Sequence, residues 1–246
     1  MRTQHVTWWS AGVETLSAQA FEELQWVCNS EERRRSERFI FARDGRSYLA
    51  AHGLLRFALS AASQLCEPDQ WRFITGTHGR PELEAGVGGA WRFNLSHCAS
   101  RVTCVVCLEV DCGVDVEPLG RSISSPEMAA YCLAPSEQRG MKELADAERK
   151  AEFVRLWTLK EALAKGVGMG LRLPFNELEF ALRPYPVVLA APAQAAGPWW
   201  LAQHVTDDGH VESLALRVDP VCAVEVSRLE WQGSRSVQCR SAPLAA

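Results

Sequence analysis

The chain has 246 residues, of which 47% are hydrophobic and 23% charged, and its formal net charge is −4. This composition is ordinary for a globular protein, and the length allows one large domain or two smaller ones that share a core. A negative overall charge argues against non-specific nucleic-acid binding, which requires a basic field. No apolar run approaches the roughly 20 residues that span a bilayer, and the N-terminus lacks a secretory signal. We therefore expect a cytoplasmic protein that binds neither nucleic acid nor membrane.

The chain contains nine cysteines, which raises the question of disulfides or a metal site. An odd number without a secretory signal makes a disulfide framework a poor explanation. Cys104 and Cys107 form a CxxC pair, but the segment around them has the pattern of a strand. Their odd spacing would put the two side chains on opposite faces, where they cannot share one zinc ion. The cysteines are therefore expected to be reduced, small core residues.

Apolar periodicity predicts a series of elements in the first half of the chain. His52 falls on the apolar stripe of the longest predicted helix, so a packed core histidine is the preferred interpretation. The expected elements are a strand at 5–9, a helix at 17–29 capped by Ser17, a helix at 44–65 capped by Asp44, and strands at 71–75, 90–97 and 101–110.

The second half of the chain repeats the same kind of order. Its expected elements are a strand at 113–119, a short helix, a strong helix at about 146–165, and strands at 176–182, 198–205, 213–219 and 222–229. The segment 190–198 has the composition of a mobile connection. Runs of strands and helices, rather than alternating βαβ units, predict an α+β architecture.

The order of elements repeats once, near Cys112. We therefore predict two similar α+β halves, each with antiparallel strands packed on helices. The N-terminal half covers residues 1–112 and the C-terminal half covers 113–232. Residues 233–246 have the composition of a disordered tail.

Asp115 and Glu117 lie two residues apart in the predicted strand GVDVEP. Residues at this spacing project from the same face of a strand, so both carboxylates can meet one site. Paired carboxylates suit Mg²⁺, which uses one or two of them together with phosphate oxygens. A solvated strand face is the alternative explanation.

The strong helix carries a second set of charged residues. Trp157, Glu161 and Lys165 recur every four residues along one face. A simple ion pair between Glu161 and Lys165, worth roughly 0.3–0.5 kcal/mol, would explain two of the three. Lys160 projects toward a stripe of leucines, where an unpaired ammonium would be costly to bury. A nearby phosphate would give Lys160 a partner.

Basic residues gather in the first half of the chain. Between Ser30 and Arg56 there are seven arginines against four acidic residues, which could also be a solvated helix entrance. Arg80 follows in a Gly-Arg-Pro turn, where the backbone can approach a ligand closely. Ser96 and His97 stand at the end of a predicted strand, although His97 taken alone could be purely structural. Acids, lysines and arginines together outline a metal-bridged polyphosphate site.

The motifs FNLSH, GVDVEP and LWTLKEALAKGVGMGL, in this order, resemble the 4'-phosphopantetheinyl transferases. The match is to the large single-chain type that activates peptide and polyketide synthetases and fatty-acid carriers. It runs from about residue 33 to 180, is most specific at the WxxKExxxK helix, and is supported by FIFARD and the GRP turn.

The resemblance implies an α+β fold of two similar halves with the cofactor between them. It implies Mg²⁺-dependent transfer of 4'-phosphopantetheine from coenzyme A to a serine of an apo acyl or peptidyl carrier protein, with release of 3',5'-ADP. A monomer would suffice. The implied roles are Mg²⁺ binding by Asp115, Glu117 and Glu161, proton removal by Glu161, charge neutralisation by Lys165 and Lys160, and phosphate contacts by Arg35, Arg80, Ser96 and His97.

Two other classes of function remain open from the sequence. A non-catalytic module that binds coenzyme A or a carrier would keep the arginines but need not keep the carboxylates. A magnesium-dependent nucleotide hydrolase would keep both, although the GxxxxGK[ST] phosphate loop does not occur in this sequence. Release of 3',5'-ADP without a carrier would distinguish the hydrolase from the transferase.

Overall fold

The structure is a computed structural model that describes residues 2–76, 80–84, 86, 88–121, 126–234 and 237–239. These residues form two compact units. Unit 1 contains the described residues up to Val110 and those from Val221 onward, and unit 2 runs from Asp111 to Pro220. Each unit is described here by itself.

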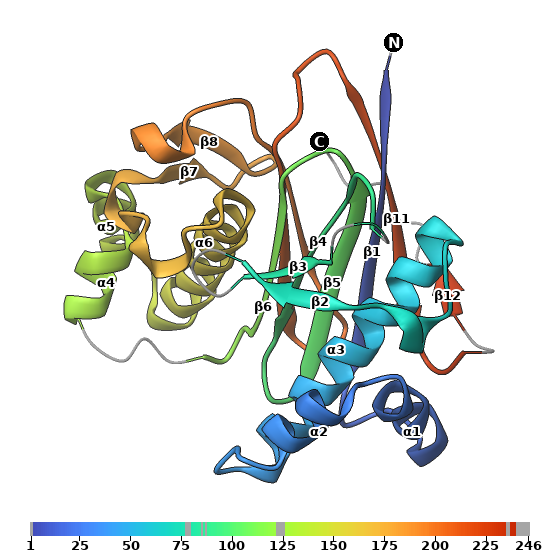
Figure 1. Cartoon of the computed structure of the whole chain (residues 1–246). Helices are drawn as coiled ribbons and strands as arrows, with labels where there is room; N and C mark the ends of the chain where they lie inside the picture. Colours follow the sequence, from blue (N-terminus) through green and yellow to red (C-terminus); the bar gives the residue numbers. More distant parts are fainter. Residues whose placement is uncertain are drawn as a thin grey trace. The chain divides into compact units, whose positions relative to one another are not determined.

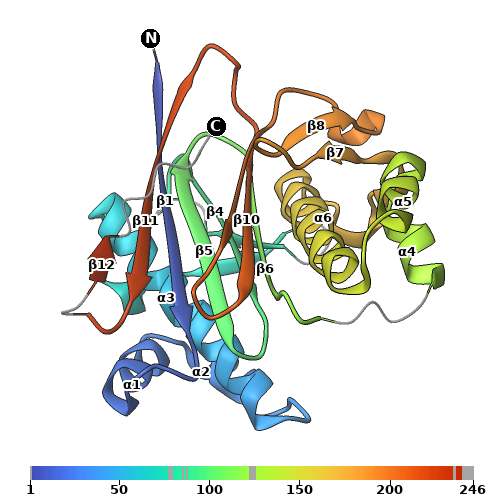
Figure 2. The same cartoon turned by 180° about the vertical axis from the view of Figure 1, so that it is seen from behind.

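Unit 1 is built on a five-stranded sheet in the order β12-β11-β1-β5-β4 (Figures 1 and 2). Its neighbouring strands run antiparallel except for β1 and β11, which pair in parallel. The strands are β1 (Thr3–Gly12), β4 (Trp91–His97), β5 (Arg101–Leu108), β11 (Ala223–Trp231) and β12 (Val237–Cys239).

A long helix, α3 (Ala42–Ser63), covers one face of this sheet, as Figure 1 shows. The shorter helices α1 (Ala18–Trp26) and α2 (Ser30–Ser36) pack against α3. A hairpin of β2 (Phe73–Thr75) and β3 (Pro81–Leu83) follows a 3₁₀ turn at Pro68–Gln70. The core between α3 and the sheet includes Leu54, Leu55, Leu59, Trp71, Phe93 and Val106, all buried.

Unit 2 has a three-stranded antiparallel sheet in the order β6-β10-β9. Helix α6 (Asp146–Val167) packs against β6 and β10, and α5 lies beside α6 (Figure 1). The remaining elements are β6 (Cys112–Pro118), α4 (Pro126–Cys132), α5 (Pro135–Lys142), 3₁₀ turns at Gly170–Arg172, Phe175–Glu177 and Ala193–Ala195, β7 (Glu179–Ala181), β8 (Val187–Ala190), β9 (Trp200–Val205) and β10 (His210–Leu216).

Two glycines fix the position and the end of α6. A Cβ atom at Gly113 of β6 would lie 2.0 Å from the carbonyl oxygen of Ala162, so only glycine allows helix and strand to approach this closely. Gly168 ends the helix with φ of 83°, and its N–H donates to the carbonyls of Ala164 and Lys165.

Each unit packs a 22-residue helix on a sheet. This arrangement confirms the α+β class expected from the sequence.

The units differ from the predicted halves in one respect. The contacts change at Val110, close to the expected boundary, but the predicted C-terminal half extended to residue 232. Strand β11 instead belongs to unit 1, because it pairs in parallel along eight residues of β1. Strand β12 lies inside the segment expected to be a disordered tail, and residues 235–236 and 240–246 of that tail lie outside the described residues.

Several local expectations also differ from the structure. Residues 30–36, expected only as the approach to the long helix, form α2, which a capping box between Asn29 and Glu32 begins. Asp44 lies in the first turn of α3, and the N-cap position belongs to Phe41. The segment 190–198, expected to be a connection, contains the 3₁₀ turn Ala193–Ala195. The eight cysteines whose side chains are described are free, and five of them are buried. None of the described helices combines the length and apolar character needed to cross a membrane.

Candidate active site

The predicted acid and lysine of unit 2 meet in an ion pair. Asp115 projects from β6 and is buried, and the Nζ atom of Lys165 on α6 lies 2.7 Å from its Oδ1 atom. The lysine side chain is held by Asp115 and remains 25% exposed. The sequence predicted both residues as part of one site.

Glu161 lies one helical turn before Lys165 and is partly buried. Burial and the nearby Asp115 carboxylate raise the pKa of Glu161 to about 7, against the lowering effect of Lys165 and Arg121. Burial and the charge of Asp115 thus disfavour the ionised form of Glu161. The structure brings Asp115, Glu161 and Lys165 together, as the sequence argument expected.

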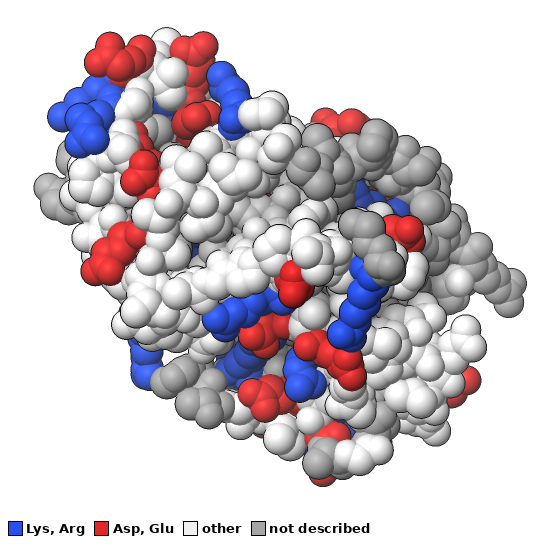
Figure 3. All heavy atoms as spheres, turned by 90° about the horizontal axis from the view of Figure 1, so that it is seen from above, with Lys and Arg blue, Asp and Glu red and all other residues white. Residues whose placement is uncertain are grey.

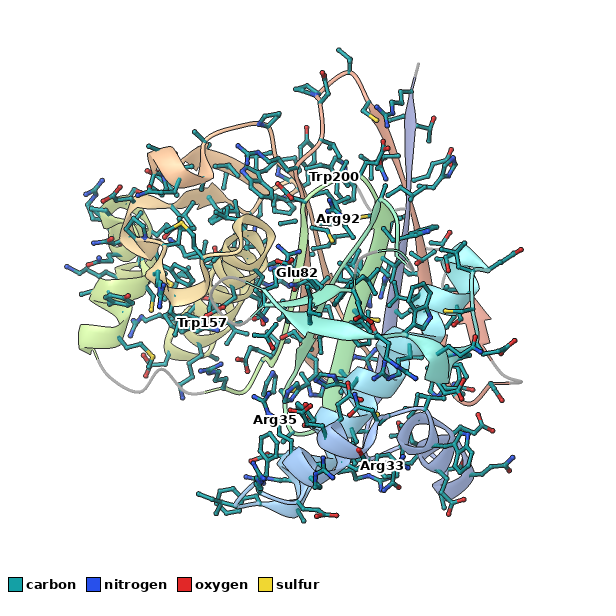
Figure 4. The ribbon with its side chains drawn as sticks, viewed as in Figure 1. Arg33, Arg35, Glu82, Arg92, Trp157 and Trp200 are labelled. Carbon is teal, nitrogen blue, oxygen red and sulfur yellow. The ribbon has the colours of Figure 1, made fainter. Side chains whose placement is uncertain are left out.

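Glu117, expected to bind Mg²⁺, has a partner among the side chains of unit 2. Its carboxylate pairs with Arg121, four residues further along the chain. The Arg121 guanidinium also lies over the ring of Trp157, 5.3 Å from its centre. Trp157 is labelled on α6 in Figure 4. Arg121 is thus a second cation near Glu161, beside Lys165. The sequence did not indicate this position, because Arg121 follows the strand motif and belongs to no recognised pattern.

Lys160, predicted as a phosphate ligand, is satisfied inside unit 2. Its Nζ atom lies 2.7 Å from Oε2 of Glu137 and donates to the carbonyls of Phe175, at 2.9 Å, and Leu178. The two charged side chains are 0% and 4% exposed. Burial lowers the pKa of Lys160, against the raising effect of Glu137. The sequence predicted that the ammonium group of Lys160 needs a partner. That partner is the Glu137 carboxylate of α5, rather than a phosphate.

Residues from three elements of unit 1 meet around the ring of Tyr48. The guanidinium of Arg35, labelled on α2 in Figure 4, lies 5.4 Å from the centre of that ring. His97 stands edge-on to the same ring at 6.3 Å, and its Nδ1 atom is 3.1 Å from the hydroxyl of Ser47. The predicted Arg35 and His97 therefore share one neighbour. That neighbour is Tyr48 of α3.

Two arginines of α2, Arg34 and Arg35, border a hollow on unit 1. It measures about 620 Å³ and is lined by Glu31, Arg34, Arg35, Arg38 and Phe39. Figure 3 views the molecule from above Figure 1 and shows basic side chains (blue) interspersed with acidic ones (red).

Helix α2 is anchored to α3 through its own buried acid, Glu32. Glu32 accepts a hydrogen bond from Arg56 at 2.8 Å, and its other oxygen lies 3.0 Å from Nδ1 of His52. Arg56 is fully buried, so this member of the predicted basic run serves the interior rather than a ligand. His52, expected to be a core histidine, is partly buried and belongs to the same network.

Arg80 and Ser96 lie at β4. Nη2 of Arg80 donates to the carbonyl of Phe93 at 3.2 Å, which places the guanidinium beside the strand that carries Ser96 and His97. Ser96 is buried. The Gly79 residue of the predicted GRP turn lies outside the described residues.

The donor set of unit 2 bears on the expected magnesium. Within the described part of the chain, no three His, Cys, Asp or Glu side chains are grouped to hold a metal ion. Of the three carboxylates expected from the sequence, Glu117 pairs with Arg121 in this structure. Mg²⁺ in phosphate-transfer sites commonly uses one or two carboxylates and takes its other ligands from substrate and water. Asp115 and Glu161 fit such a site.

Comparison with known proteins identifies the family. The family model described as the 4'-phosphopantetheinyl transferase superfamily matches residues 111–215. A second model, 4'-phosphopantetheinyl transferase, N-terminal, matches residues 15–108. The two matches divide the chain where the two units divide.

Individual relatives agree with these models. The 4'-phosphopantetheinyl transferase HetI of Nostoc sp. is 32% identical over 200 residues, covering 79% of this chain and 81% of the relative. The 4'-phosphopantetheinyl transferase Sfp of Bacillus subtilis is 26% identical over 200 residues, covering 79% and 84%. Among solved structures, a holo-(acyl-carrier-protein) synthase from Bacillus anthracis in complex with CoA (3',5'-ADP) has 18% identity and a TM-score of 0.37, over 44% of this chain and 95% of that chain. Together, the two family models and the relative from Nostoc show that this chain is an enzyme of the 4'-phosphopantetheinyl transferase superfamily, of the large single-chain type.

Proposed function

We propose that the enzyme transfers the 4'-phosphopantetheine group of coenzyme A to a serine of an apo acyl or peptidyl carrier protein, with Mg²⁺ and with release of 3',5'-ADP. The observation that carries the proposal is the Asp115–Lys165 ion pair beside the partly buried Glu161. It combines a fixed cation with a carboxylate in the part of the chain that matches the family.

In the proposed reaction, the serine Oγ forms a bond to the phosphorus that carries pantetheine. The bond from that phosphorus to the bridging oxygen breaks, and 3',5'-ADP leaves with the electron pair and added negative charge. Lys165 neutralises part of this charge, while Asp115 keeps its ammonium in place. Glu161 accepts the proton of the serine hydroxyl.

The proposed metal site uses the two carboxylates of unit 2. Asp115 and Glu161 would hold Mg²⁺, which when bound supplies positive charge to the pyrophosphate oxygens. Glu117 would contribute to metal binding only if it exchanged its partner Arg121. Lys160 has no place in this proposal, because its ammonium is fully buried on Glu137.

Unit 1 would supply the contacts to the nucleotide. We assign Arg35, Arg80, Ser96 and His97 to the phosphates of coenzyme A, supported by the clustering of Arg35 and His97 at Tyr48. Arginine binds phosphate in two-pronged fashion and keeps its charge at any working pH. We also propose that the enzyme is monomeric and acts in the cytoplasm. Size-exclusion chromatography would test the oligomeric state.

The experiment that tests the function is direct. The purified protein is incubated with coenzyme A, Mg²⁺ and a panel of apo-carriers, and each carrier is followed by intact mass. The expected result is the gain of one phosphopantetheine group, lost in excess chelator and lost when the carrier serine is replaced by alanine. Production of 3',5'-ADP at the same rate with and without a carrier would instead establish a hydrolase. Absence of both products would contradict the proposed function.

A further inference from the structure

A row of polar side chains crosses the sheet of unit 2 beneath α6. Ser213 of β10 pairs with Asp115 of β6 on one side and with Gln203 of β9 on the other. Directly paired residues in neighbouring antiparallel strands project from the same face of the sheet. The same face bears Gly113, which contacts α6. The row Asp115–Ser213–Gln203 therefore faces the helix.

Each member of this row is linked to α6. Asp115 pairs with Lys165 at 2.7 Å. Ser213 donates from its Oγ atom to the Oγ1 atom of Thr158 at 2.8 Å. Gln203 donates from Nε2 to the carbonyl of Arg155 at 2.9 Å and to the hydroxyl of Ser213 at 3.0 Å.

The same helical face carries the reacting residues. Thr158, Glu161 and Lys165 stand at positions i, i+3 and i+7, which superpose on one side of an α-helix. The Thr158 and Ser213 side chains are completely buried. The hydroxyl of Thr158 also donates to the carbonyl of Arg155 at 3.1 Å, so it acts as both donor and acceptor within unit 2.

Apolar packing does not by itself set the rotation of a helix. Apolar burial is non-directional, whereas a hydrogen bond weakens steeply when its angle or distance departs from ideal. A rotation of α6 by one residue would turn Thr158 away from Ser213 and, at the same time, move Glu161 and Lys165 away from Asp115. The two sets of contacts are therefore satisfied by the same helix orientation.

We propose that Thr158, Ser213 and Gln203 are positioning residues that hold α6 in the rotation at which Glu161 and Lys165 face Asp115. They touch no substrate and act through the helix. This inference rests on the proposed transfer reaction.

The test compares two substitutions at one position. Thr158→Val keeps the shape of the side chain and removes the hydroxyl, whereas Thr158→Ser keeps the hydroxyl and removes the methyl group. A third variant, Val154→Ala, deletes methyl groups at a buried position of the same helix without touching the polar row. Urea unfolding of each variant and single-turnover transfer to an apo-carrier are measured at a temperature where all are folded.

We expect Thr158→Val to lower kcat by about tenfold or more while the KM for coenzyme A stays within about threefold, since the lost contact acts on the reacting groups rather than on binding. Thr158→Ser should recover most of the rate. Val154→Ala should shift the urea midpoint downward with kcat nearly unchanged. Ser213→Ala should resemble Thr158→Val, and the double variant should be no worse than either single one.

Two results would overturn the inference. In the first, Thr158→Val loses only stability and keeps kcat, as Val154→Ala does. In the second, Thr158→Ser is as slow as Thr158→Val, so the hydroxyl is irrelevant. Either result leaves the proposed function intact, because wild type and variants still transfer. A wild-type enzyme that modifies no carrier would instead remove the proposed function, and this inference with it.

Discussion

At the scale of single residues, the candidate site of unit 2 is determined by how its charged groups are paired. Lys165 has Asp115, Lys160 has Glu137 and Arg121 has Glu117. Glu161 is the acid of this site whose ionised form is disfavoured, because burial and the Asp115 carboxylate both raise its pKa. Its surroundings therefore favour the binding of a proton or another cation.

The first prediction concerns Glu161 itself. Glu161→Gln preserves size and one acceptor oxygen but removes the negative charge and the basicity. We expect kcat to fall by at least about a hundredfold, the usual contribution of a positioned general base. Coenzyme A should still bind nearly as well, since the arginines of unit 1 are unchanged. Single-turnover transfer beside calorimetric coenzyme A binding measures the two effects.

Glu152→Gln is the control for this change. It lies on the same helix and removes the same charge, away from Asp115 and Lys165, and it should transfer at nearly the wild-type rate. If Glu161→Gln also transferred at that rate, Glu161 would not be the general base of the reaction.

The second prediction concerns Glu117 and Arg121. Because the two side chains pair with each other, Glu117→Gln and Arg121→Met should produce the same change, a rise in KM for coenzyme A of no more than about tenfold. The double variant should be no worse than either single one, as expected for two residues that act as a unit. Steady-state kinetics of the three variants tests this.

A metal-binding role for Glu117 would give a different pattern. Glu117→Gln would then raise the Mg²⁺ concentration needed for half-maximal rate, and Arg121→Met would leave that concentration unchanged. The Mg²⁺ titration of both variants therefore decides between the two roles of Glu117.

At the scale of elements, one buried ion pair connects several segments of unit 2. Glu137 begins α5 by accepting from the N–H of Ala134 at 2.8 Å, and it accepts from the N–H of Phe180 in β7 at 3.0 Å. Lys160 adds contacts from α6 to the carbonyls of Phe175 and Leu178. The pair thus holds α5, α6 and the 175–180 segment together.

The third prediction follows from this arrangement. Lys160→Met leaves the Glu137 carboxylate buried without its counter-ion, which should cost about 3–5 kcal/mol in the free energy of unfolding. The double variant Lys160→Met with Glu137→Gln removes both charges, keeps an acceptor oxygen for the backbone N–H groups, and should recover part of that loss. Urea denaturation of the wild type, both single variants and the double variant measures these differences.

The kinetics of the double variant separate a structural lysine from a ligand. We expect its KM for coenzyme A to equal that of the wild type, because neither charge contacts the substrate. A KM raised tenfold in Lys160→Met and not restored in the double variant would mean that Lys160 binds phosphate after all.

At the scale of the whole molecule, stability in acid depends on buried carboxylates such as Glu32. Burial alone would raise the pKa of Glu32, but the hydrogen bond with His52 and the charge of Arg56 outweigh burial and lower it to about 2. The ordinary value of this carboxyl group is 4.5. The folded state therefore holds the ionised form more strongly than the unfolded chain does.

The fourth prediction is the resulting dependence of stability on pH. Because the pKa is lowered on folding, the contribution of Glu32 is fully present above pH 4.5 and is lost as the pH falls toward 2. A shift of this size corresponds to about 3 kcal/mol. We expect the unfolding free energy of the wild type to fall between pH 5 and about pH 2, and that of Glu32→Gln to be lower at pH 7 and to fall less steeply. Parallel slopes for the two proteins would contradict this assignment.

The two-unit organisation also belongs to this scale. The boundary near Cys112 was visible in the order of predicted elements, and the structure divides at Val110. The return of the chain into unit 1 was not visible, because β11 has the alternating pattern of any half-buried strand. Such a pattern does not say which strand is the neighbour or whether the pairing is parallel.

The sequence by itself determined those features that the local spacing of residues encodes. The two-residue spacing of Asp115 and Glu117 places them on one face of a strand, and the four-residue spacing of Glu161 and Lys165 places them on one face of a helix. These short-range periodicities, with the motif resemblance, were enough to predict the α+β class, the family, and the meeting of Asp115 with Lys165.

Only the tertiary structure decided which charged and polar side chains pair with one another. Lys160 binds Glu137, 23 residues earlier in the chain, Arg56 binds Glu32, and Thr158 binds Ser213. These partners are separated along the sequence by stretches with no common period, so no local pattern points from one to the other. The physical reason is that burying a charge or a polar group without a partner is energetically costly. Which partner lies within reach depends on how the elements pack in three dimensions.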